Sequence, residues 1–205
     1  MPVIFSNKID SSTSLCVWHI TETEESLFSN LILNDDDISN IIRLKLNKRR
    51  VEKLACRQCL AYLLKDNNID LHYGSHGEPI IHNYYISFSH SDKFAAVAIS
   101  KKYPVGIDIE KMGTRIIPLT YKFMNEKELE ISESNNSEYF HYFWGAKEAI
   151  YKIHKEKNLD FKENILVKKN EQKGYLLSGK SKCEFKIYNW IVEKMMLVCV
   201  TRINE

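Results

Sequence analysis

Two short charged motifs in the second half of the chain contain the residue types that phosphate chemistry needs. The first, Val105 to Glu110, reads VGIDIE, and its alternation of apolar and other residues is typical of a half-buried strand. Because side chains alternate along a strand, Asp108 and Glu110 are expected on one face, opposite the two isoleucines. This motif therefore predicts a strand that presents two carboxylates together.

The second motif, Trp144 to Lys152, reads WGAKEAIYK and is typical of a helix. Its residues Trp144, Glu148 and Lys152 are four apart and share one face. At ~100° per residue, the apolar face lies nearly opposite. That apolar face comprises Tyr139, Phe143, Ala146 and Ile150.

If this strand and helix meet, the carboxylates of Asp108, Glu110 and Glu148 converge beside Lys152. Hard divalent cations such as Mg²⁺ prefer oxygen ligands of this kind and leave coordination positions open for substrate phosphates. The two motifs together therefore predict a site for a divalent cation, with coordination positions open to substrate phosphates.

Each motif by itself also has a simpler interpretation. Glu148 and Lys152 have the spacing of an exposed ion pair on a solvated helix face, which contributes only ~0.3–0.5 kcal/mol. Asp108 and Glu110 have the spacing of the solvated face of an edge strand. Their flanking residues favour the functional interpretation.

From about Lys48 to Asn158 the chain resembles the 4′-phosphopantetheinyl transferase superfamily, in its surfactin-type (Sfp-like) class. The G-x-D-x-E and W-x-x-K-E-x-x-x-K motifs of the family are matched fully by the two segments above. Partial matches are Gly77-Glu78-Pro79, Ile86 to Ser91 (ISFSHS) and Phe123 to Glu128. The chain departs from the family pattern at Glu78, at Gly145 and over residues 154–158.

The resemblance implies transfer of the 4′-phosphopantetheine arm from coenzyme A to a serine of an apo acyl or peptidyl carrier protein, with adenosine 3′,5′-bisphosphate released. It implies that Mg²⁺, with Mn²⁺ as a substitute, is held by Asp108, Glu110 and Glu148. Glu148, Lys152 and Asp108 are the expected catalytic residues. Glu128 aligns with a family acid near the metal and is ranked below these three. The coenzyme A contacts are expected from Arg50, Arg57, Ser89, His90, Lys147 and Lys152.

The order of predicted elements suggests two parts with a boundary at Lys101 to Pro104. Strands are expected at 15–20, 86–99 (broken at 89–93), 105–110, 165–168, 174–177, 183–188 and 195–202, and helices at 24–33, 50–65 and 138–155. The resemblance implies an α+β fold of two similar lobes with pseudo-twofold symmetry, each a small antiparallel sheet packed with helices. Residues 1–103 are expected to supply nucleotide contacts, and residues 104–205 the metal site and the carrier-docking surface.

Two sets of basic residues have the composition of binding surfaces. On the helix predicted from Arg50 to Lys65, Arg50, Arg57 and Lys53 share a face that suits phosphate, or equally an ordinary solvated basic face. After the first motif, three cations alternate with apolar residues, a pattern that suits an acidic carrier helix or a helix with one core face. The cations are Lys111, Arg115 and Lys122, and the apolar residues are Met112, Ile116, Ile117, Leu119, Phe123 and Met124.

Composition sets broader limits on function and location. The 205 residues are 44% hydrophobic, enough for a packed core, and the net charge of +2 gives no support for nucleic-acid binding. The first ten residues lack an apolar stretch, and no apolar run approaches the ~20 residues of a membrane span. Five cysteines, with a lone Cys56-x-x-Cys59, predict buried thiols in a reduced cytoplasmic protein.

Two other functions fit parts of the pattern. A different Mg²⁺-dependent phosphohydrolase would use the same carboxylates without an acceptor protein. A non-catalytic carrier-binding module would keep the fold, although an unused site gains nothing from holding three like charges together. The interpretation preferred here is a monomeric transferase, with neither its carrier protein nor its tolerance of acyl-coenzyme A donors identified.

Overall fold

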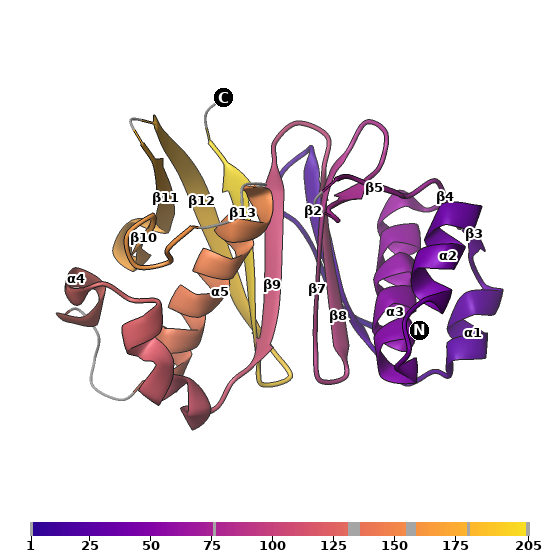
Figure 1. The fold of residues 1–205 in the computed structure, drawn as a ribbon, viewed down its shortest axis with the longest axis horizontal. Helices are drawn as coiled ribbons and strands as arrows, with labels where there is room; N and C mark the ends of the chain where they lie inside the picture. The colour runs from indigo at the N-terminus through magenta and orange to yellow at the C-terminus, as the bar shows by residue number, and fades with distance from the viewer. Residues whose placement is uncertain (1, 76, 131–135, 155–158, 180, 204–205) are drawn as a thin grey trace. The chain divides into compact units, whose positions relative to one another are not determined.

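The computed structural model describes residues 2–75, 77–130, 136–154, 159–179 and 181–203. The predicted helix end at residue 155 and the departure from the family pattern at 155–158 lie outside these ranges. Two compact units account for the chain, Met1–Lys102 and Tyr103–Glu205. Both units combine an antiparallel sheet with helices, so the predicted α+β class is confirmed (Figure 1).

Unit 1 is built on a four-stranded antiparallel sheet with the order β1-β2-β8-β7. These strands are β1 (Val3–Lys8), β2 (Thr13–His19), β7 (Tyr85–Ser91) and β8 (Phe94–Ser100). The predicted strands at 15–20 and 86–99 are confirmed, and the hairpin turn is shorter than expected, with only Asp92 and Lys93 between β7 and β8. Strand β1 was not predicted.

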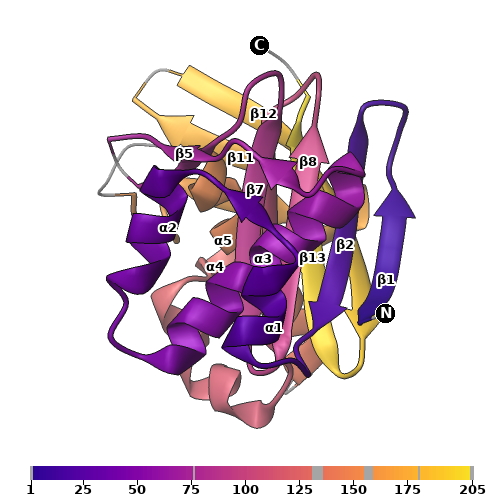
Figure 2. The ribbon, with the colours of Figure 1, turned by 90° about the vertical axis from the view of Figure 1, so that its right-hand side faces the viewer.

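Helices cover one face of this sheet, as Figure 2 shows for unit 1. They are α1 (Glu24–Ser29), α2 (Asp35–Ile42) and α3 (Asn47–Leu64), with two-stranded pairs formed by β3 (Ile32–Leu33) with β4 (Asn68–Ile69) and by β5 (His72–Tyr73) with β6 (Pro79–Ile80). The long α3 packs on β2 and β8, and its residues Leu54, Cys59 and Leu60 are fully buried in the core. Helix α1 ends at Ser29, four residues before the predicted end.

Unit 2 has a five-stranded antiparallel sheet with the order β10-β11-β12-β13-β9. Its strands are β9 (Val105–Lys111), β10 (Ile165–Lys168), β11 (Lys173–Ser178), β12 (Ser181–Val192) and β13 (Met195–Arg202). Its helical segments are the 3₁₀ helix η1 (Thr114–Lys122), α4 (Glu126–Glu130), α5 (Ser137–Ile153) and the short η2 (Lys169–Glu171). The predictions for β10 and β13 are correct at both ends.

Helix α5 is the central packing element of unit 2 and lies against β9 and β13 (Figure 1). Its start is fixed by Asn136, whose side chain accepts hydrogen bonds from the amides of Glu138 and Tyr139. A glycine then permits close approach: a Cβ on Gly106 of β9 would stand 1.9 Å from the carbonyl oxygen of Ala149. Strand β9 and helix α5 are therefore in backbone contact where the predicted motifs lie.

All five cysteines are free thiols. Cys16, Cys56, Cys59 and Cys199 are buried, and Cys183 is partly exposed. Burial raises the pKa of Cys59 and of Cys199, which keeps both thiols protonated and unreactive. The prediction that the C-x-x-C pair packs as buried thiols is confirmed.

Candidate active site

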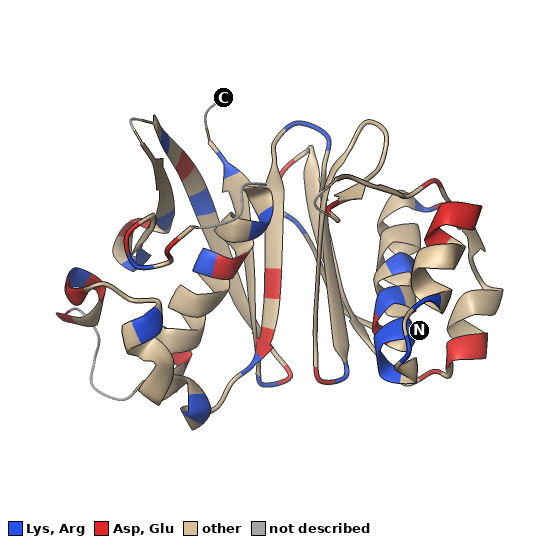
Figure 3. Cartoon of the chain, viewed as in Figure 1, with Lys and Arg blue, Asp and Glu red and all other residues tan. Residues whose placement is uncertain are grey.

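The two predicted motifs come together within unit 2. Lys152 of α5 donates hydrogen bonds to the Asp108 carboxylate and to the Ile107 carbonyl oxygen of β9, each at 2.8 Å. The Asp108 side chain is 5% exposed and that of Lys152 is 28% exposed. Figure 3 marks the acidic residues of β9 in red and the charges of both signs on α5. The pairing of strand with helix is therefore as predicted.

Strand β9 is more deeply buried than its alternating pattern suggests. Residues 105–109 are all buried, and Glu110 is the first partly exposed residue. The expectation of a half-buried strand is wrong, because both faces of its first five residues are covered. Asp108 is consequently a buried carboxylate, and its Oδ2 lies 3.7 Å from the position a Cβ would take on Gly145.

Helix α5 presents the predicted charged face. Trp144, Glu148 and Lys152 are partly exposed, whereas the predicted apolar residues of the helix are buried. Partial burial raises the pKa of Glu148 to about 7, and the charges of Asp108 and Glu110 add to this increase, while Lys152 opposes it. The charges of Asp108 and Glu110 therefore act on Glu148, which places the three predicted carboxylates within electrostatic reach of that residue.

The donor set suits a hard cation, since three carboxylates with one adjacent ammonium match the oxygen-ligand preference of Mg²⁺. No group of three or more His, Cys, Asp or Glu side chains is gathered closely enough to hold a metal, within the ranges that the structure describes. The Asp108 oxygen Oδ1 is instead hydrogen-bonded to Lys152. The three-carboxylate metal site thus stays a prediction. What supports it is that carboxylate oxygens are suitable ligands for Mg²⁺.

Lys147 lies away from solvent. Its side chain is fully buried, and its ammonium donates to Glu128 Oε2 and to the carbonyl oxygen of Phe161, both at 2.8 Å. Burial lowers the pKa of Lys147, and the Glu128 charge opposes that shift. To contact a nucleotide, Lys147 would have to break both bonds, so we assign it to the packing of unit 2. It stands four residues after Phe143, a spacing that already placed it beside the apolar face.

Glu128 is equally committed to the interior of unit 2. Besides Lys147, it accepts hydrogen bonds from the amides of Asn125 and Val167, at 3.0 and 2.8 Å. Its side chain is 5% exposed. These contacts tie α4, α5 and β10 together, and they satisfy the carboxylate without a metal.

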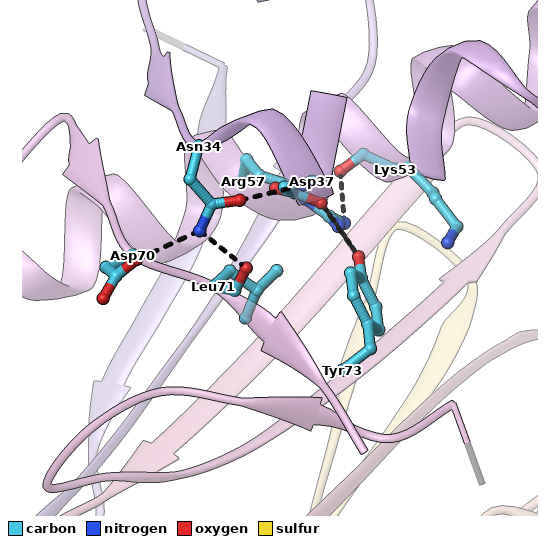
Figure 4. Close-up of polar contacts among 7 residues, drawn as sticks. All are labelled: Asn34, Asp37, Lys53, Arg57, Asp70, Leu71 and Tyr73. Atoms are coloured by element: carbon cyan, nitrogen blue, oxygen red, sulfur yellow. Dashed lines mark hydrogen bonds and ion pairs between the residues drawn. The ribbon is translucent and has the colours of Figure 1, made fainter. Parts of the chain in front are cut away.

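In unit 1, Arg57 is a structural residue for the same reason as Lys147: it is buried, and its donors are already hydrogen-bonded within the protein. Its guanidinium donates to both Asp37 oxygens, and both side chains are almost fully buried. Tyr73 adds a hydrogen bond to Asp37 at 3.0 Å and contacts Arg57, while Asn34 caps α2 and reaches the Leu71 carbonyl (Figure 4). The expectation of a solvated basic face is wrong for Arg57, because α2 covers that side of α3.

Within unit 1, Arg50 and His90 are the more accessible of the predicted nucleotide contacts. Arg50 is 23% exposed and pairs with Glu24 at 2.7 Å. His90 is 31% exposed, and its Nδ1 lies 3.4 Å from the buried carboxylate of Glu52. Ser89 is buried on β7, and its carbonyl oxygen lies near the Cys56 thiol. Their role in binding coenzyme A stays a prediction.

The predicted docking segment forms the 3₁₀ helix η1 and its flanks. Ile116, Phe123 and Met124 are buried in the core of unit 2, so they cannot serve as contact residues. The exposed residues there include Lys111, Arg115, Leu119, Tyr121 and Lys122, which keep the mixture of apolar and basic character.

Sequence reasoning missed His141, a 7% exposed residue of α5. Its Nε2 accepts a hydrogen bond from the Gly113 amide at 3.0 Å, which fixes the turn between β9 and η1. Burial lowers its pKa and favours the neutral ring that this bond requires. No motif identified His141; its position three residues before Trp144, beside the apolar face of α5, was the only signal.

Comparison with known proteins points to one class. Residues 104–194, which lie within unit 2 and include both motifs, match the model of the 4′-phosphopantetheinyl transferase superfamily. The chain is also similar to a particular protein, the 4′-phosphopantetheinyl transferase of Bacillus subtilis, at 30% identity over 84 residues. That stretch is 39% of this chain and 37% of the relative, so less than half of either protein is matched.

Proposed function

We propose that this protein transfers the 4′-phosphopantetheine arm of coenzyme A to a serine hydroxyl of an apo acyl or peptidyl carrier protein. The observation that carries the proposal is the bond between Lys152 of α5 and Asp108 of β9, beside a Glu148 carboxyl whose pKa is raised by burial and by the charges of Asp108 and Glu110. This cluster lies in the segment that is similar to the superfamily. The curated relative is itself a 4′-phosphopantetheinyl transferase, which agrees with the proposed reaction.

In this reaction the serine oxygen bonds to the phosphorus that carries the pantetheine. The bond from that phosphorus to the bridging oxygen of the pyrophosphate breaks, and adenosine 3′,5′-bisphosphate leaves. The proposed acceptor of the serine proton is Glu148, either directly or through a water molecule. Lys152 stabilises the negative charge on the leaving phosphate.

Asp108, Glu110 and Glu148 would hold Mg²⁺, which supplies positive charge to the pyrophosphate oxygens when bound. Asp108 also orients Lys152 through the bond of 2.8 Å, and the Ile107 carbonyl supports the same ammonium. Among the described residues, no helix combines the length and apolarity needed to cross a membrane.

The exposed residues of η1 and its flanks suit the acidic recognition helix of a carrier protein. Arg115 and Lys122 supply charge there, and Leu119 and Tyr121 supply apolar contact. For coenzyme A, His90 and Arg50 are the proposed donors to the 3′-phosphate. We also propose that the protein acts as a monomer, which sedimentation at assay concentration would test.

The decisive experiment is intact-mass spectrometry of candidate apo carriers after incubation with the protein, coenzyme A and Mg²⁺. The expected result is a carrier heavier by one phosphopantetheine group. Asp108→Ala and Glu148→Ala should each lower the rate at least about 10²–10³-fold. Glu163→Ala, an exposed acid elsewhere in unit 2, serves as the matched control and should retain full activity.

Two results would overturn this proposal. Near-normal transfer by either site variant would remove the carboxylates from the reaction. Coenzyme A cleavage that proceeds equally well without any carrier would identify a phosphohydrolase. Calorimetry of coenzyme A binding with and without Mg²⁺ adds an independent check, since a carrier-binding module alone should give no metal-dependent heat.

A further inference from the structure

A pocket of about 320 Å³ lies in unit 2, bounded by the start of α4, the first half of α5 and the segment of β10 and η2. None of the proposed catalytic residues lines this pocket. Tyr139 and Phe143 contribute to its wall, and they stand on the face of α5 opposite Glu148 and Lys152. The pocket is thus distinct from the candidate active site.

Its walls are largely apolar. Tyr139 and Phe143 are one helical turn apart and their ring centroids are 4.7 Å apart, so they form a continuous aromatic surface. Leu166 and Val167 of β10 add aliphatic surface. The volume is near the lower end of the ~300–1,000 Å³ of ligand pockets, which suits a small molecule.

The charged residues of the lining leave a positive balance. The Glu128 carboxylate is already matched by Lys147, and the Glu171 carboxylate by Lys168, at 2.8 Å in each pair. Lys127 and Lys169 also line the pocket, and no carboxylate of the described residues pairs with either of them. Glu126 and Glu130 of α4 are exposed but do not line it.

Lys169 is held at a defined position. Its ammonium lies 4.7 Å from the centroid of the Tyr139 ring and 5.7 Å from that of Tyr142. Such cation–π contacts fix the ammonium against an aromatic wall and leave its donors available on the other side. A cation beside apolar surface is the arrangement that recognises an amphiphilic anion.

We propose that this pocket binds a small organic anion with an apolar body, of the class of medium-chain carboxylates. The apolar body lies against Tyr139, Phe143 and Leu166, and the carboxylate accepts hydrogen bonds from Lys169 and Lys127. This site is independent of the proposed transferase reaction, because it shares no residue with the carboxylate cluster.

Calorimetric titration with three probes tests the chemistry. Octanoate combines charge with an apolar chain, 1-octanol lacks the charge, and acetate lacks the chain. Octanoate should bind more tightly than both, and affinity across the carboxylate series should rise about fourfold per added methylene until the pocket is filled. Equal binding of octanoate and 1-octanol, or of octanoate and acetate, would overturn the proposal.

Variants locate the site. Lys169→Met keeps most of the apolar stem and should weaken octanoate about three- to tenfold without affecting 1-octanol. Lys182→Met is the matched control, because Lys182 also lies over a tyrosine, 4.1 Å from the Tyr175 centroid, but does not line the pocket. An equal effect of both variants would refute a specific role for Lys169.

Nuclear magnetic resonance of the unaltered protein gives a readout that does not depend on any variant folding. Octanoate should shift the amide signals of Leu166, Lys169 and Glu171 while leaving those of Val105 to Ile109 unchanged. The reverse pattern would place the ligand elsewhere and end the proposal. Leu166→Trp, which fills the pocket, should abolish these shifts if its melting temperature is retained; if the variant unfolds, the wild-type spectra decide.

Discussion

Helices α3 and α5 occupy similar positions in their own units but hold their charges differently. Each packs on an antiparallel sheet, and each buries a cation against a carboxylate from a neighbouring segment, Arg57 with Asp37 and Lys147 with Glu128. Both helices also present partly exposed charges: α3 has Arg50 and Lys53, and α5 has Glu148 and Lys152. The two helices differ in what surrounds these charges. Arg50 is paired with the opposite charge of Glu24, whereas Glu148 lies near two like charges, Asp108 and Glu110. Groups of like charge held near one another are typical of functional sites.

Cutting the two buried pairs should have the largest effect and would test their structural role. Lys147→Met and Arg57→Met each leave a carboxylate buried without its cation, which costs about 3–5 kcal/mol. Urea unfolding should show this loss for both variants. Lys147→Met combined with Glu128→Gln should recover much of it, because no uncompensated charge remains.

Lys152→Met is the comparison within α5. It also leaves a buried carboxylate, Asp108, without its cation, but the Lys152 position is 28% exposed, so water can solvate that carboxylate and the loss of stability should be smaller. If Lys147→Met lowers the free energy of unfolding no more than Lys152→Met does, Lys147 does not have the larger structural role that we assign to it. A Lys147→Met variant that folds normally yet loses affinity for coenzyme A would show that Lys147 contacts the nucleotide after all.

The pKa of Glu148 gives a prediction of intermediate size for the metal-free protein. Folding raises this pKa from 4.5 to about 7, so the folded state binds the proton more tightly than the unfolded state does. The stability that this proton binding contributes is complete below pH 4.5 and is lost as the pH rises through about 7. Glu148→Gln stays neutral and avoids that loss.

In the presence of a chelator, Glu148→Gln should therefore melt several degrees above the parent protein at pH 8, an effect on the order of 1–3 kcal/mol. At pH 5 the difference should fall below about 1 kcal/mol. Scanning calorimetry at both pH values measures it, with Glu163→Gln as the control. A lower melting temperature for Glu148→Gln at pH 8 would mean that the three carboxylates do not repel one another.

The smallest predicted effect concerns unit 1. His90→Ala should weaken binding of coenzyme A about tenfold or more, while leaving dephospho-coenzyme A unchanged, because the proposed target is the 3′-phosphate. His72→Ala is a matched control, as His72 is also exposed and lies beside an acid, Asp70, at 3.0 Å. If His90→Ala weakened the binding of coenzyme A and of dephospho-coenzyme A equally, His90 would not contact the 3′-phosphate.

The sequence predicted two apolar strands and the charged face of one helix best. Strands β10 and β13 were correct at both ends, and the shared face of Trp144, Glu148 and Lys152 was confirmed. Strand β1 was missed because its exposed and partly buried residues alternate as an edge strand does, without a marked apolar run. Helix α1 was predicted too long because Ile32 and Leu33, read as helical, form the short strand β3.

The site was predictable as a set of residue types, but the burial of its neighbours was not. Arg57 is covered by α2, a helix whose sequence DDDISNII begins with three acids and gave no sign that Asp37 would be buried. Whether a charged side chain lies in solvent or in a pair depends on which segment packs against it, and that partner comes from elsewhere in the chain. The burial of Asp108 follows the same rule, since both faces of its strand are covered.

The buried thiols can report local unfolding of the protein, because each becomes reactive only when the unit around it opens. Cys16, Cys56 and Cys59 belong to the core of unit 1, and Cys199 is buried in unit 2. A pulse of alkylating reagent followed by peptide mass analysis would therefore record the opening of each unit separately, without any introduced label. Cys183, partly exposed on β12, would react first and calibrate the reagent.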